Sequence, residues 1–66
     1  MKIVCNGESL DIREGISVEE YIRELGLNPD TVVVECNGNI LLRENYKSEI
    51  LQDGTVLEII RFVGGG

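Results

Sequence analysis

The sequence predicts an α+β fold, in which a mixed sheet of four to five strands carries one main helix across it. The chain has 66 residues, enough for one small hydrophobic core and therefore one domain. Apolar residues alternate with polar ones in several short segments, as in strands, whereas a single segment has the period of a helix. Hydrophobic residues make up 42% of the chain and charged residues 27%, which is typical of a folded globular protein and not of a disordered one.

Residues 1–13, MKIVCNGESLDIR, predict a β-hairpin. Asn6-Gly7 tolerates the positive φ angles of a tight turn, and the alternation on either side of it places the apolar side chains of each strand on one face. These alternating residues are Met1, Ile3, Cys5, Leu10 and Ile12.

Residues 17–29, SVEEYIRELGLNP, predict an amphipathic helix. Ser17 and Glu20 have the spacing of a capping box at its start. Gly26 suits the left-handed position after the last turn, and Pro29 prevents the helix from continuing. The helix should bury a stripe of Val18, Ile22 and Leu25, with Tyr21 beside it, and expose a weak ion pair between Glu19 and Arg23.

A third strand is expected in TVVVECNG, where Glu35 faces water and Asn37-Gly38 turns the chain into NILL. The residues that this strand should bury are Val32, Val34 and Cys36. The following stretch, RENYKSEILQDG, has no clean period and predicts a connection with a short turn or edge strand. Asp53-Gly54 marks a further turn.

The last strand, TVLEIIRFV, is the most apolar segment of the chain, which favours a central place in the sheet. A right-handed crossover through the helix favours parallel first and last strands, side by side. The expected strand order is second, first, last, third, with the helix lying diagonally on one face. This order is the β-grasp, or ubiquitin-like, architecture.

A central last strand presents two faces. Leu57 and Ile59 should point toward the helix, leaving Glu58, Ile60 and Phe62 on the opposite face. Two interpretations of the exposed apolar residues stay open. The connection at residues 43–53 could fold over them, or they are scattered exposed residues of an ordinary surface. Alternatively, Ile60, Phe62 and the adjoining Val63 form a partner-binding patch.

The domain should span residues 1–63, followed by a flexible glycine tail at residues 64–66. Glycine-rich ends are often without function. Residues 61–66 could instead form a stalk of up to about 20 Å that delivers a terminal carboxylate into a narrow active site. In that interpretation Gly64 and Gly65 thread the partner's active site, because glycine has no side chain to block a tunnel and adopts whatever φ the site demands.

Charge and composition exclude several classes of function. Twelve acidic and six basic residues give a net charge of −6, so nucleic acids and membranes are poor partners and basic protein surfaces are better ones. No segment has the length of a signal sequence or membrane span, so we expect a cytoplasmic protein. The chain has no histidine, phosphate-binding loop or metal-ligand cluster, which predicts that it is not an enzyme, binds no metal and holds no cofactor.

Two cysteines, Cys5 and Cys36, are too few and too far apart for a redox motif or a zinc site. They are expected to be small buried hydrophobic residues on two strands. The predicted strand order separates them by the last strand, which disfavours a disulfide.

Over nearly its whole length the sequence resembles the ThiS family, the ubiquitin-like sulfur carriers of thiamine thiazole biosynthesis. The resemblance lies in the start, MKI followed by NGE, in VVVECNG, and in the terminal LQDGT and LEIIRFVGGG. Thr55 departs from the family, which often has an acidic residue after the turn glycine.

The resemblance implies a carrier that is the substrate of other enzymes. A ThiF-type activating enzyme would use ATP and magnesium to adenylate the carboxylate of Gly66. A persulfide from a sulfur donor enzyme would then displace AMP and leave a thiocarboxylate, whose sulfur passes to thiazole synthase (ThiG). Two alternatives stay open: a small subunit of molybdopterin synthase, and a ubiquitin-like adaptor without sulfur chemistry.

Overall fold

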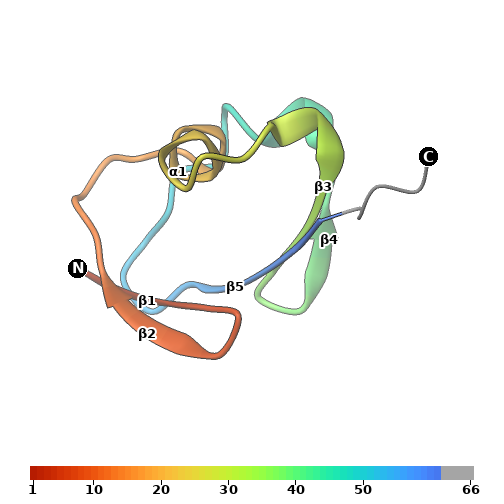
Figure 1. Ribbon diagram of the computed structural model, residues 1–66. Helices are drawn as coiled ribbons and strands as arrows, with labels where there is room; N and C mark the ends of the chain where they lie inside the picture. Colours follow the sequence, from red (N-terminus) through yellow and green to blue (C-terminus); the bar gives the residue numbers. More distant parts are fainter. Residues whose placement is uncertain (62–66) are drawn as a thin grey trace.

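The computed structural model describes residues 1–61, in which a curved sheet wraps around a single α-helix (Figure 1). The five strands of this part are β1 (Lys2–Cys5), β2 (Glu8–Asp11), β3 (Val32–Cys36), β4 (Asn39–Leu41) and β5 (Val56–Arg61). The helix is α1 (Val18–Glu24), and two short 3-10 helices follow, η1 (Pro29–Thr31) and η2 (Arg43–Asn45). The predicted boundary between a domain and a tail lies outside the described residues and stays a prediction.

The strand order is β2-β1-β5-β3-β4. β1 runs parallel to β5, whereas the other neighbouring pairs are antiparallel. The predicted β-grasp order and the parallel pairing of first and last strands are therefore confirmed, with β4 added at the edge beside β3. Because β5 pairs on both sides, the strand that leads toward the carboxyl end of the chain lies at the centre of the sheet.

Two Asn-Gly turns connect β1 to β2 and β3 to β4, as predicted. Asn6 and Gly7 have φ of 51° and 81°, and Asn37 and Gly38 have φ of 51° and 86°. Successive positive φ angles match the right-handed twist of the two strands, and asparagine and glycine are the residues that adopt them most readily.

The predicted ends of α1 are confirmed. The Ser17 hydroxyl accepts from the Glu20 N–H at 3.1 Å, and the Glu20 carboxylate accepts from the Ser17 N–H at 2.9 Å, which completes the capping box. Gly26 follows the last turn with φ of 80°. Pro29 begins η1, where a proline needs no hydrogen-bonded N–H.

Two details of the helix prediction are wrong. Leu25 is 47% exposed, because α1 ends one residue before it and Leu27 packs against the core instead. The Glu24 carboxylate pairs with Arg13 from the preceding loop, and no ion pair joins Glu19 to Arg23 within residues 1–61.

The core lies between the sheet and α1, and the connection before β5 completes it. Tyr46 and Leu51 are both buried, and the Tyr46 hydroxyl donates to the Val32 carbonyl at 3.1 Å. Backbone hydrogen bonds from Val18 to Glu49 and from Leu51 to Ile16 fix the connection beside the start of the helix. No periodic pattern in residues 43–53 predicts these contacts. The core residues are Ile3, Cys5, Ile16, Val18, Tyr21, Ile22, Val32, Val34, Tyr46, Leu51, Leu57 and Ile59.

The two cysteines are free, and β5 separates their strands. Cys5 is buried as predicted, whereas Cys36, at the end of β3, is only half-buried. Burial raises the pKa of both thiols above the ordinary value of 9.0. Both side chains are therefore protonated and poorly nucleophilic at neutral pH.

Candidate docking face and carrier terminus

Strand registers define the side chains on the open face of the sheet, the face opposite α1. Val33 lies beside Ile60 across β3 and β5, and Val4 lies beside Val56 across β1 and β5. Ile40, on the edge strand, lies beside Glu35 on the same face. These five apolar residues, Val4, Val33, Ile40, Val56 and Ile60, are called the open-face patch below.

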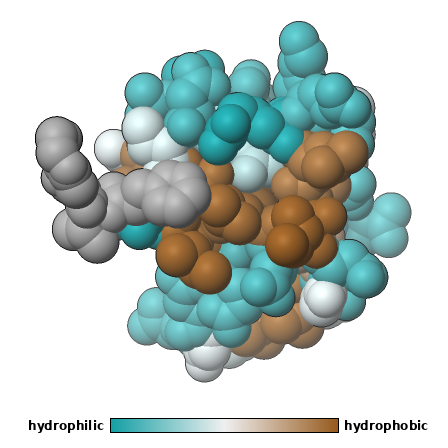
Figure 2. Space-filling view, turned by 90° about the vertical axis from the view of Figure 1, so that its right-hand side faces the viewer, coloured by the Kyte–Doolittle hydropathy of each residue, from teal (hydrophilic) through white to brown (hydrophobic). Residues whose placement is uncertain are grey.

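The patch is accessible. Ile40 is 68% exposed, Ile60 is 50% exposed and Val56 is 44% exposed, while Val4 and Val33 are half-buried. Figure 2, which looks onto the side of the molecule where β3 and β4 lie, shows hydrophobic side chains gathered in its centre with hydrophilic ones around them. Isolated exposed apolar residues are common, but several on adjacent strands form a surface suited to a partner protein.

The connection at residues 43–53 does not cover this patch. Its buried residues, Tyr46 and Leu51, belong to the core on the helix side, and its backbone bonds run to residues 16–19 at the start of α1. The interpretation in which this connection folds over Ile60 is therefore wrong. The other predicted members of the patch, Phe62 and Val63, lie outside the described residues.

Two glutamates divide the patch. Glu35 and Glu58 lie directly opposite each other on β3 and β5, on the same face as Ile40 and Ile60. Like charges in such a pair repel each other, and no ion pair in residues 1–61 neutralises them. The open face therefore combines apolar contact area with an uncompensated negative charge.

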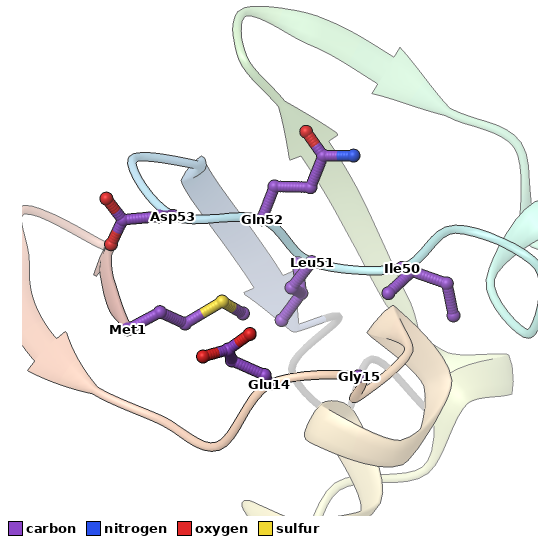
Figure 3. A pocket seen from close by; sticks show the side chains of 7 residues that line it. All are labelled: Met1, Glu14, Gly15, Ile50, Leu51, Gln52 and Asp53. Carbon is purple, nitrogen blue, oxygen red and sulfur yellow. The ribbon is translucent and has the colours of Figure 1, made fainter.

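A shallow hollow lies elsewhere, near the turn that precedes β5 (Figure 3). Met1, Glu14 and Leu51 turn toward one another there, whereas the Gln52 side chain points away. The carboxylate of Asp53 at its rim already accepts a hydrogen bond from the Lys2 N–H at 2.8 Å. The hollow lies at the start of β5, opposite the end from which the chain continues toward Gly66. Its residues offer no nucleophile or paired acid and base aimed at a common point.

The described residues contain neither a cluster of metal ligands nor a membrane-spanning helix. No three histidine, cysteine, aspartate or glutamate side chains in residues 1–61 lie close enough together to hold a metal ion. No helix of this part is long and apolar enough to cross a membrane.

Gly64, Gly65 and Gly66, the residues predicted to thread a partner and carry sulfur, lie outside the described part. β5, with Leu57 and Ile59 anchored in the core and Ile60 on the open face, leads toward them. In the sequence, the exposed Ile60 precedes Gly66 by six residues.

Comparison with known proteins decides the family. The sequence model of the ThiS family matches residues 2–66. The chain belongs to the ThiS family. Its fold superimposes on the crystal structure of the thiamine biosynthesis protein ThiS from Geobacter metallireducens with a TM-score of 0.84 and 32% identity, covering both chains completely. The chain is also 36% identical to the sulfur carrier protein ThiS of Bacillus subtilis over 50 residues. This match covers 76% of each of the two chains.

A different kind of relative is longer. The whole of this chain is 39% identical over 66 residues to part of a thiazole synthase of Paramagnetospirillum magneticum, of which it covers 20%. A thiazole synthase of Magnetococcus marinus matches with 36% identity and the same coverage. The chain thus spans about a fifth of the length of the thiazole synthases that it matches.

These comparisons confirm the predicted resemblance to the ThiS family. They favour this family over the molybdopterin synthase subunit and the adaptor that the sequence alone left open.

Proposed function

We propose that this ThiS-family protein carries sulfur as a thiocarboxylate on Gly66 and donates it for formation of the thiazole ring of thiamine. The family match supports the proposal most directly, because it extends through the terminal glycines to residue 66. The described residues are compatible with a carrier that other enzymes act upon, since the open-face patch is exposed and residues 1–61 contain no aligned catalytic groups.

The proposed chemistry begins at the carboxylate of Gly66, which is a poor acyl donor. A ThiF-type activating enzyme, using ATP and magnesium, converts it into an acyl adenylate and releases pyrophosphate. The terminal sulfur of a persulfide on a donor enzyme then displaces AMP, and cleavage of the sulfur–sulfur bond by a thiol leaves the thiocarboxylate. We place this reaction in the cytoplasm, where ATP is available.

The role of the tail follows from the geometry of glycine. Gly64 and Gly65 have no side chains, so this part of the chain can enter a channel that would exclude any other residue. In the proposed function these two residues thread the active site of the partner, and Gly66 is the residue that is modified.

The open-face patch is the proposed docking surface for the activating enzyme and for thiazole synthase, with Phe62 and Val63 extending it. Its mixture of apolar side chains with Glu35 and Glu58 favours a partner surface that is apolar and carries a basic side chain. The thiazole synthase relatives support the second partner: a segment similar to this whole chain occurs within those longer proteins. A synthase that contains such a segment holds carrier and acceptor at high effective concentration.

The proposal is tested by incubating the protein with ATP, magnesium, the activating enzyme and a persulfide donor, followed by mass spectrometry. The C-terminal peptide should gain the mass difference between a sulfur and an oxygen atom. Deletion of Gly66, or a tag added after it, should abolish this gain while the circular dichroism spectrum stays unchanged. The matched control carries the same tag before Met1 and should be loaded normally. Normal loading of the deletion variant would refute the mechanism, and an unmodified wild-type protein would favour an adaptor.

A further inference from the structure

The side chain of Asn6 continues the sheet at the point where β1 turns away from β5. The parallel register pairs Val4 with Val56 and Cys5 with Leu57, and the Asn6 N–H donates to the Leu57 carbonyl at 2.9 Å. Beyond this bond the backbone of β1 has entered the turn. The Asn6 carboxamide forms the next two hydrogen bonds to β5. Its Oδ1 accepts from the Ile59 N–H at 2.8 Å, and its Nδ2 donates to the Ile59 carbonyl at 3.3 Å.

A carboxamide has the same donor and acceptor as a peptide group, so Asn6 supplies the pairing that a longer β1 would have supplied. The turn alone does not explain this residue. A φ of 51° is also tolerated by aspartate and glycine. Only asparagine combines that conformation with a side chain of this length that both donates and accepts.

The second Asn-Gly turn provides an internal comparison. Asn37 has the same φ of 51°, and its Oδ1 accepts from the Val56 N–H at 2.9 Å. This contact holds the first residue of β5, whereas the contacts of Asn6 hold Ile59, near the other end of the strand. The two asparagines therefore bind opposite ends of the same central strand.

The contact between Asn6 and Ile59 lies next to the open-face patch. The side chain of Ile59 is buried, and the next residue, Ile60, lies in the open-face patch. Without the carboxamide, the N–H and carbonyl of Ile59 would lose their partners on the β1 side, and only β3 would hold the backbone there. Strand ends held on one side open more readily than those held on both.

We propose that Asn6 is a positioning residue for the reaction at Gly66: its carboxamide fixes the end of β5 and so sets the direction in which the chain leaves the sheet. This inference rests on the proposed function. Asn6 is proposed to act through the backbone of Ile59, by holding β5 in place at Ile59 and Ile60.

The test compares Asn6→Gly with Asn37→Gly. Glycine adopts the positive φ of both turns, so each variant keeps its turn and loses only the side-chain contact to β5. ATP–pyrophosphate exchange by the purified activating enzyme is measured as a function of carrier concentration. Because the open face is intact, Asn6→Gly should leave KM nearly unchanged and lower kcat about tenfold through misplacement of the reacting group. Asn37→Gly should retain the wild-type kcat.

Amide hydrogen exchange measured by NMR gives a second readout that follows the contact itself. The N–H of Ile59 should exchange faster in Asn6→Gly, and the N–H of Val56 should exchange faster in Asn37→Gly. Asn6→Asp retains the oxygen that accepts from Ile59, so both the protection of that N–H and kcat should recover part of the way toward wild type.

Equal losses of kcat in the two glycine variants would overturn the inference, because they would reflect stability alone. A wild-type kcat in Asn6→Gly, with the Ile59 N–H exposed to exchange, would also overturn it. Failure of the wild-type protein to be adenylated would refute the proposed function instead, and the two failures are thus distinguishable.

Discussion

The two faces of the sheet share one backbone and both carry aliphatic side chains, but their surroundings are opposite. Along β5, Leu57 and Ile59 face α1 and are almost completely buried, whereas Val56 and Ile60 on the other face are about half exposed. Both sets are aliphatic, so composition does not separate them. One face packs against the helix and the connection at residues 43–53, while the other leaves apolar area exposed.

Hydrophobic surface on the covered face stabilises the fold, whereas hydrophobic surface on the open face is proposed to bind a partner. Burial of the covered face stabilises a small domain whose size leaves little reserve. The open face contributes little to stability as long as it stays in water, and in the proposed function it contributes to binding when a partner covers it. Each of the following predictions tests this division, from the largest expected effect to the smallest.

Replacing Leu57 with alanine should lower the free energy of unfolding by about 2 to 5 kcal/mol, because it leaves a cavity beneath α1. Replacing Ile60 with alanine, on the same strand but on the open face, should change it by about 0.5 kcal/mol or less. Urea unfolding followed by circular dichroism measures both values. Equal destabilisation by the two substitutions would show that the faces do not differ in this way.

Replacing Ile60 with aspartate should weaken binding to the activating enzyme by about 1 to 3 kcal/mol, because it places a charge in the docking surface. The matched control is Leu25→Asp, since Leu25 is exposed to a similar extent, 47% against 50%, but lies at the end of α1. Isothermal titration calorimetry should detect weaker binding only for the Ile60 variant. Phe62→Asp is predicted to act like Ile60→Asp. Weakening by the Leu25 substitution alone would move the docking surface to the helix.

The cap of the covering helix should make stability depend on pH. Hydrogen bonds from the Ser17 N–H and hydroxyl lower the pKa of Glu20 below its ordinary value of 4.5. The stabilisation by the ionised carboxylate is therefore complete above about pH 4.5 and is lost as the pH falls through the lower pKa of the folded state. Urea unfolding at a series of pH values should show this decline. Glu20→Gln should flatten it, and an unchanged pH dependence in that variant would contradict the assignment.

The thiols on the covered face should be dispensable for sulfur transfer. Both are protonated at neutral pH and separated by β5, so the variant with Cys5→Val and Cys36→Ala should accept sulfur at the wild-type rate. The loading assay, with thermal unfolding as the control for folding, measures this. Loss of loading in a folded double variant would assign one of the thiols a role in transfer.

Local patterns were sufficient to predict much of the fold. The two Asn-Gly turns, the capping box of Ser17 and Glu20, and the central apolar strand each depend on neighbouring residues, and each is confirmed. The order of the strands also followed, because the handedness of the crossover restricts how a helix can join two strands.

The core and the site were predicted less completely. Tyr46 and Leu51 belong to a segment without periodicity, and their burial depends on hydrogen bonds to residues that lie far away in the sequence. Leu25 has the spacing of a buried residue, yet the helix ends before it. Ile60 was correctly placed opposite the helix, but its exposure depended on where the connection folds. The sequence offered no signal that Asn6, a residue typical of a turn, would also hold Ile59.

By itself the sequence determined the elements, the turns and the resemblance to a family of sulfur carriers, because these depend on local spacing and on motifs of adjacent residues. Only the tertiary structure decided which apolar side chains stay exposed and which asparagine holds which end of β5. The physical reason is that burial and long-range hydrogen bonds are properties of pairs of segments, whose separation in space no local pattern contains.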